Sequence, residues 1–293
     1  MSVRSFAPRS DQRSGRHSRQ RGVALLVVLW ACTLLAILLG GYAMLARTEG
    51  LQARYQFAQT RAHYAAEAGL TRAIYGLQDP VAPRRWLANG RAYVFQFDDA
   101  SVSVTCTDEG GKVDLNSASP EVLQRLFQAA GQRADTAHAL AAAVVDWRNY
   151  STDAGLTALS TRPGGAPRHA PFASVEELQQ VPGMTAALYR AIASQITIWS
   201  GRESPDPDTA SSLALAAIPG MTPQQASAIA AARLHQRPGA GLVASNGTTH
   251  SIRAVATLSD GTRAVLGATI RLQGIQPNGQ PYAVLRWQEG DRE

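Results

Sequence analysis

The strongest pattern in the chain is an apolar run near its N-terminus that continues into an amphipathic helix. Residues 23–46 read VALLVVLWACTLLAILLGGYAMLA and contain no charged side chain. A helix of this length spans about 36 Å, which is enough to cross a hydrocarbon core of about 30 Å. Residues 47–78 contain no proline, and their apolar positions recur mostly at helical spacings. The pattern predicts one continuous helix of about 55 residues, with its first half in a membrane.

Short segments of alternating apolar and polar residues predict strands at two separate places in the chain. They are residues 92–97, 102–106, 252–258, 265–272 and 282–287. Turn residues separate them, with Asp98–Ser101 in the first pair and Asp260-Gly261 and Pro277-Asn278-Gly279 in the later group. The late strands are expected to form an antiparallel meander that completes the sheet begun by the early ones.

The stretch between these groups of strands is rich in alanine and leucine and contains several helix starts. Ser119 precedes Pro120 and Glu121, as expected of a capping serine with proline at the first helical position. Ser174 and Glu177 have the spacing of a capping box, and the stretch that begins at Thr222-Pro223 predicts another helix start. A further helix is predicted over residues 135–148.

This helical stretch also contains an internal repeat. Residues 178–185 read LQQVPGMT and residues 215–222 read LAAIPGMT. The repeats resemble helix-hairpin-helix elements, which bind the DNA backbone through a Gly-x-Gly turn. Threonine replaces the second glycine in both copies (Thr185 and Thr222), and few basic side chains lie nearby. A compact helical packing unit is therefore the favoured interpretation, over a nucleic-acid site.

Together these patterns predict an α+β fold in which a long N-terminal helix packs on an antiparallel sheet and a large all-helical domain is inserted. We expect five segments: a leader (1–22), the membrane half of the helix (23–46), the helix end with two strands (47–113), the inserted helical domain (114–240) and the C-terminal strands (241–293).

The charge distribution fits this division. The chain carries a net charge of +6, and residues 1–22 hold six arginines against one aspartate. The rest of the chain has 22 basic and 21 acidic residues, so it offers little electrostatic affinity for nucleic acid. The positive-inside rule places residues 1–22 in the cytoplasm and the later residues across the membrane.

Sequence motifs for catalysis are absent. The chain contains no Gly-x-Ser-x-Gly, phosphate loop or metalloprotease helix, so we expect no enzyme. The six histidines have no metal-ligand spacing, and each is expected at the surface. Cys32 lies in the apolar run and Cys106 in a predicted strand, so the predicted topology prevents their pairing.

The start of the apolar run resembles a known processing site. Arg21-Gly22 before the run is similar to the prepilin peptidase site of type IV pilins and type II secretion pseudopilins. The resemblance implies cleavage after Gly22 and methylation of the new N-terminal amine on Val23. Val27 then occupies the fifth mature position, where the family usually has a glutamate that pairs with the subunit above. Because an unpaired carboxylate is costly in hydrocarbon, its absence suits a filament tip. The alternative is an ordinary signal anchor.

Three further motifs resemble one family. They are VDLNSASP (residues 113–120), Val145-Asp146-Trp147 and PFASVEELQQVPGMT (residues 171–185). In this order they are similar to the type II secretion minor pseudopilin K family, also called general secretion pathway protein K. The resemblance implies a non-catalytic subunit at the pseudopilus tip that initiates assembly and supports export of folded proteins across the outer membrane.

The same resemblance implies a location and a set of partners. The chain would be a single-pass inner-membrane protein with its soluble part in the periplasm. Its partners would be the minor pseudopilins I and J, prepilin peptidase, and secreted substrates or the outer-membrane channel, with no nucleic acid. Two alternatives stay open, namely a type IV pilus minor pilin and a membrane-anchored DNA receptor with helix-hairpin-helix elements.

Calcium is the one cofactor that the resemblance raises, because some members bind it through an acidic cluster after the Asp-Trp pair. Asp146, Asn149 and Asp153 are the candidate oxygen ligands here. The glutamate expected further on is missing, since residues 164–167 read GGAP. A solvated polar loop is therefore the favoured interpretation of this segment.

Overall fold

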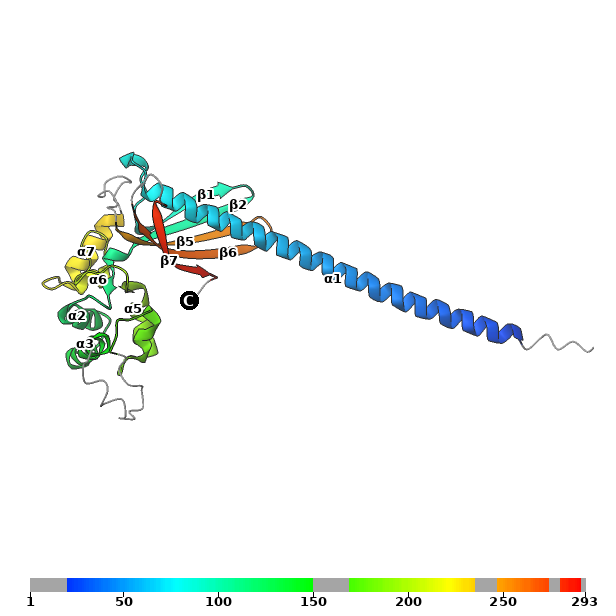
Figure 1. Cartoon of the computed structure of the whole chain (residues 1–293), viewed down its shortest axis with the longest axis horizontal. Helices are drawn as coiled ribbons and strands as arrows, with labels where there is room; N and C mark the ends of the chain where they lie inside the picture. Colours follow the sequence, from blue (N-terminus) through cyan, green and yellow to red (C-terminus); the bar gives the residue numbers. More distant parts are fainter. Residues whose placement is uncertain (1–19, 150–168, 235–246, 274–279, 291–293) are drawn as a thin grey trace, which may run out of the picture. The chain divides into compact units, whose positions relative to one another are not determined.

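A computed structural model describes residues 20–149, 169–234, 247–273 and 280–290 (Figure 1). The chain divides into two compact units, residues 1–58 and 59–293. The first unit holds most of helix α1, which runs from Gln20 to Leu77. Among the described residues, α1 is the one helix long and apolar enough to cross a membrane. Its large apolar side chains from Val23 to Leu45 are exposed, as expected of a surface that lipid would cover.

The second unit contains a five-stranded antiparallel sheet in the order β1-β2-β5-β6-β7. Its strands are β1 (Asn89–Phe97), β2 (Ala100–Asp108), β5 (Thr249–Leu258), β6 (Arg263–Leu272) and β7 (Tyr282–Glu289). The short helix η1 (Ala82–Arg84) leads from α1 into β1. β2 and β5 pair over their whole length, from Ala100 opposite Leu258 to Asp108 opposite His250. The early and late strands therefore form one sheet, and the predicted α+β fold is confirmed.

The C-terminal part of α1 packs across one face of this sheet (Figure 1). Small residues on the helix make the approach close: Ala62, Ala65, Ala66 and Ala73 are buried. At Gly69 the contact is tightest, because an added Cβ would lie 2.8 Å from Val102 Cγ1. The helix and the sheet thus meet with almost no room for another methyl group.

Between β2 and β5 the chain forms a mostly helical insert. Its elements are η2 (Glu109–Gly111), β3 (Val113–Asp114), α2 (Pro120–Ala129), α3 (Ala134–Arg148), η3 (Val175–Gln180), α5 (Ala186–Ile192), η4 (Ala193–Gln195), β4 (Ile196–Thr197), α6 (Ser212–Ala216) and α7 (Pro223–Leu234). β3 and β4 pair in parallel, so the insert is not purely helical. One apolar core joins α2, α3 and α5, and a smaller core joins α6 and α7.

The turns differ slightly from the prediction. The first hairpin turns at Asp98-Asp99, where Asp98 has a φ of 53°, and the predicted turn residues Ala100 and Ser101 already belong to β2. Gly261 has a φ of 87° and makes the predicted turn between β5 and β6. The predicted turn at Pro277-Asn278-Gly279 lies outside the described residues.

The packing at Gly69 gives a direct test of how α1 meets the sheet. We expect Gly69→Ala to destabilise the folded chain by roughly 1–3 kcal/mol, because the new methyl group overlaps Val102 and overpacks the core. Thermal unfolding of the full chain in detergent, followed by circular dichroism, measures the change.

Gly50→Ala is the matched control, because the same helix has no atom within 4 Å of a Cβ at that position. There alanine should leave stability unchanged or raise it slightly through its better helix propensity. Equal effects of the two substitutions would contradict the close packing at Gly69.

Candidate functional site

The first signature motif is built around the buried carboxylate of Asp114. Its Oδ1 accepts hydrogen bonds from the backbone N–H groups of Asn116 (2.8 Å) and Ser117 (3.1 Å). Its Oδ2 accepts from Gly201 N (2.8 Å) and from the hydroxyl of Ser200 (3.2 Å). Because a buried carboxylate is tolerated only when its oxygens are bonded, this one aspartate ties the start of the insert to the segment after β4.

Two neighbours of Asp114 extend the same network. The side-chain amide of Asn116 donates to the carbonyl of Phe172 (3.1 Å) and accepts from its N–H (2.7 Å). The guanidinium of Arg148 donates to the carbonyls of Leu115 (2.8 Å) and Ala118 (2.7 Å). Burial lowers the pKa of Arg148, and the nearby charge of Asp114 opposes that shift. The first motif is thus bonded to Phe172 in the third motif and to Arg148, which directly follows the second motif.

The second and third motifs meet at a buried glutamate. The indole N–H of Trp147 donates to Glu177 Oε1 (3.0 Å), and the N–H of Ala173 donates to Oε2 (2.9 Å). The rings of Trp147 and Phe172 stack with centroids 6.3 Å apart. The predicted capping box is wrong, because Ser174 makes no side-chain cap and the Glu177 carboxylate binds Trp147 and Ala173. The three motifs form one structural network.

Other predicted helix starts are confirmed. Ser119 accepts from Val122 N at the start of α2. In the repeat, Thr185 caps α5, and Thr222 and Gln225 bond reciprocally at the start of α7. The glycines before these threonines have φ values of 87° at Gly183 and 80° at Gly220, a conformation that favours glycine. In each copy of the repeat, the threonine side chain is therefore the N-cap of the helix that follows the turn.

A second buried carboxylate joins the insert to the sheet. Glu109 is only 2% exposed, and its oxygens accept from the ammonium of Lys112 (2.5 Å), the hydroxyl of Ser251 (2.6 Å) and the hydroxyl of Thr197. Lys112 directly follows η2, Ser251 belongs to β5 and Thr197 to β4. A further ion pair joins Arg286 on β7 to Glu176 on η3 at 2.6 Å. Although burial opposes it, the Arg286 guanidinium lowers the pKa of Glu176.

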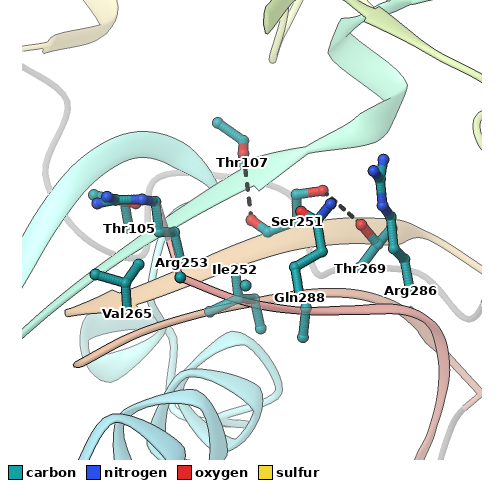
Figure 2. Close-up of a pocket in the computed structure, with 12 residues that line it drawn as sticks. Thr105, Thr107, Ser251, Ile252, Arg253, Val265, Thr269, Arg286 and Gln288 are labelled. Carbon is teal, nitrogen blue, oxygen red and sulfur yellow. Dashed lines mark hydrogen bonds between the residues drawn. The ribbon is translucent and has the colours of Figure 1, made fainter. Parts of the chain in front are cut away.

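A hollow lies on the sheet beside this junction (Figure 2). It has a volume of about 280 Å³, and hydroxyl and arginine side chains line much of it: Thr105, Thr107, Ser251, Arg253, Thr269 and Arg286. The hydroxyl of Thr107 donates to the Ser251 carbonyl (3.3 Å), and the hydroxyls of Ser251 and Thr269 are 3.0 Å apart. The lining is suited to binding polar groups.

His250 contradicts the expectation that all the histidines lie at the surface. It is 3% exposed, and neither ring nitrogen has a hydrogen-bond partner among the described residues. Burial lowers its pKa, opposed by the nearby carboxylates of Asp108 on β2 and Glu109 on η2. Burial in turn raises the pKa of Asp108. The sequence could have predicted this burial, because side chains alternate along β5 and His250 lies on the same face as the apolar Ile252 and Ala254.

The residues predicted for processing and for calcium binding lie at separate places in the structure. Gly22, Val23 and Val27 lie within α1, and the side chains of Val23 and Val27 are exposed. Asp146 is exposed on α3, and Asn149 is exposed just after it, whereas Asp153 lies outside the described residues. Within the described part of the chain, no group of three or more His, Cys, Asp and Glu side chains could hold a metal. The calcium site stays a prediction.

The buried imidazole gives a pH prediction. Because the folded chain lowers the pKa of His250 below the ordinary 6.5, it favours the neutral ring. This contribution to stability is complete above 6.5 and is lost as the pH falls toward the folded-state pKa. Asp108 acts in the opposite sense, since its raised pKa favours the folded state at the acidic end.

We therefore expect His250→Leu to lose less stability than the natural chain as the pH falls below 6.5, measured by thermal unfolding across a pH series. His138→Leu is the control, because His138 is exposed on α3. Parallel pH profiles for the natural chain and His250→Leu would show that His250 does not govern this dependence.

Comparison with known proteins supports one family. Residues 102–201 match the family model described as type II secretion system (T2SS), protein K. No curated protein matches the sequence. A solved structure, the GspK-GspI-GspJ complex of the enterotoxigenic Escherichia coli type 2 secretion system, contains a chain with the same fold. The TM-score is 0.53 at 17% identity, covering 84% of this chain and 100% of that one.

The matched region begins in β2 and ends just after β4, so it contains all three signature motifs. The family match therefore covers the hydrogen-bond network around Asp114, Asn116 and Glu177. The match over residues 102–201 and the shared fold together support a type II secretion minor pseudopilin K.

Proposed function

We propose that the chain is the minor pseudopilin at the tip of the type II secretion pseudopilus, where it initiates assembly and supports export of folded proteins across the outer membrane. The observation that carries this proposal is the insert that holds the three motifs, placed between β2 and β5 of a sheet that packs on the C-terminal part of α1. Its role is assembly, not catalysis.

The proposed location follows from the helix. Residues 23–46 anchor the chain in the inner membrane, residues 1–22 lie in the cytoplasm, and residues 47–293 lie in the periplasm. The supporting features are the exposed apolar surface of α1 and the arginines before it. Prepilin peptidase then cleaves after Gly22 and leaves a methylated amine on Val23.

The proposed partners are the minor pseudopilins I and J. The solved structure of similar fold is a complex of three proteins, which supports the same kind of assembly here. Small residues on α1, including Ala24, Ala31, Ala36, Gly40 and Gly41, allow close approach of partner helices. Secreted proteins or the outer-membrane channel are the further partners of the periplasmic part.

Processing is tested by intact mass. We expect chain extracted from cells with prepilin peptidase to have lost residues 1–22 and gained a methyl group, and chain from cells without the enzyme to keep its full mass. Gly22→Leu is the control, because a large side chain beside the scissile bond should block cleavage. An uncut natural chain in both cells would make it an ordinary anchored protein.

The tip position is tested at Val27. We expect Val27→Glu to reduce co-purification with I and J from detergent, because a carboxylate with no subunit above it costs several kcal/mol in hydrocarbon. Val27→Leu keeps the side chain apolar and should leave co-purification unchanged. Equal recovery of the complex with glutamate and leucine would count against a tip position.

A further inference from the structure

The sheet begins with an asparagine that is followed by a bulge. Asn89 is the first residue of β1, and Gly90 and Arg91 come next. The register with β2 passes directly from Asn89 to Ala92, so within the described sheet Gly90 and Arg91 have no cross-strand partner. Gly90 has a φ of 82°, a left-handed conformation that glycine adopts readily. The backbone that follows Asn89 therefore lies outside the regular ladder of the sheet.

The side chain of Asn89 bridges this bulge. Its Oδ1 accepts a hydrogen bond from the backbone N–H of Arg91 at 3.2 Å, so the side-chain carbonyl spans the peptide unit of Gly90. A donor at Oδ1 also stabilises negative charge that develops there when a nucleophile attacks Cγ. Gly90 and Arg91 are exposed, and Asn89 is half-buried, so water reaches the segment.

The glycine leaves the neighbouring nitrogen accessible. A side chain at position 90 would stand beside the backbone nitrogen and hinder its approach to Asn89 Cγ, and glycine has none. The surroundings are open as well, because the nearest atom to a Cβ placed on Gly90 would be Thr107 Cγ2 at 3.8 Å. The nitrogen and the carbonyl carbon are thus adjacent, unhindered and in contact with solvent.

We propose that Asn89 is a site of spontaneous deamidation in the folded chain. The Gly90 backbone nitrogen attacks Asn89 Cγ, so that an N–Cγ bond forms and the Cγ–Nδ2 bond breaks. Ammonia leaves with the proton of the Gly90 N–H, and a five-membered succinimide ring remains. Water then opens the ring at either carbonyl carbon and gives aspartate or isoaspartate. The balance is one water consumed and one ammonia released, with no change of oxidation state.

Asn116 in the insert is held in a way that prevents the same reaction. Its side-chain amide is bonded at both ends to the backbone of Phe172. The nitrogen that would attack belongs to Ser117, and its N–H already donates to the buried carboxylate of Asp114 at 3.1 Å. Ser117 also carries a side chain beside that nitrogen. Asn116 is therefore the matched comparison for Asn89 within one molecule.

The products change the charge where the sheet meets the insert. Asn89 lines a hollow of about 510 Å³ together with residues of both parts, among them Asp108 at the end of β2 and Lys112 after η2. Each product carries a carboxylate in place of a neutral amide, and isoaspartate also adds one carbon to the main chain before Gly90. This inference goes beyond the proposed function, since it requires neither processing at Gly22 nor assembly with I and J.

Peptide mapping by mass spectrometry measures the reaction in the full chain, held folded in detergent at mildly alkaline pH. Trypsin cuts after Arg85 and Arg91, so the peptide WLANGR carries Asn89 as its single amide side chain. We expect this peptide to gain about 1 Da, the difference between an amide and an acid. The rate should be no less than roughly one tenth of the rate in the same chain unfolded in guanidinium, because the bulge needs little local opening. Asn116 should keep its amide while the chain stays folded.

Two variants separate this chemistry from general damage. Asn89→Gln keeps a side-chain amide but would need a six-membered ring, so its peptide should keep its mass. Gly90→Ala places a methyl group beside the attacking nitrogen and should slow the conversion in the folded and in the unfolded chain.

Conversion of Asn89 in the unfolded chain alone would overturn the proposal, because the bulge would then protect the side chain. Equal conversion of Asn89 and Asn116 in the folded chain would also overturn it, since the local structure would make no difference. An unchanged rate in Gly90→Ala would contradict attack by the neighbouring nitrogen.

Discussion

The buried carboxylate of Asp114 is the interaction on which the helical insert depends. Its four donors come from residues 116–117 and 200–201, so it joins the start of the insert to the segment after β4. Two other buried carboxylates also join distant segments. Glu177 joins the second motif to the third, and Glu109 joins the insert to β5. Burying a carboxylate away from water is costly. The oxygens of these three carboxylates regain hydrogen bonds only when segments distant in the sequence come together. The buried polar residues of the signature motifs therefore hold the insert together.

This arrangement explains how a sheet can accept so large an insert. The chain leaves β2 at Asp108 and returns to β5 at Thr249, and the strands are paired up to the opposition of Asp108 and His250. The two ends of the insert are thus cross-strand neighbours, about 5 Å apart, and the register of the sheet is undisturbed. The C-terminal part of helix α1 packs on one face of that sheet. An apolar helix long enough to cross a membrane, a sheet and an inserted domain suit a subunit that assembles with partners.

Local patterns predicted most elements, and long-range bonds account for the failures. Apolar periodicity predicted α1 and the strands, because burial on one face imposes it. The caps at Ser119 and Thr222 were predictable since their partners lie three residues away. The capping box at Ser174 was wrong, and the bond of its Glu177 carboxylate to an indole 30 positions earlier is one that no local pattern contains. His250 could have been found from strand parity, whereas the pairing of Asp114 with Gly201 could not. The processing site at Gly22 remains a prediction from resemblance.

The most direct test of this account is amide hydrogen exchange of the full chain compared with Asp114→Asn, which keeps the shape of the side chain but removes its charge and one acceptor. The account predicts that protection falls together at Asn116, Ser117 and Gly201, although Gly201 is far away in sequence. It also predicts lower protection of the Phe172 amide, which donates a hydrogen bond to the Asn116 side chain. A loss confined to residues 116–117, with Gly201 and Phe172 still protected, would contradict the claim that this carboxylate joins the start of the insert to the segment after β4.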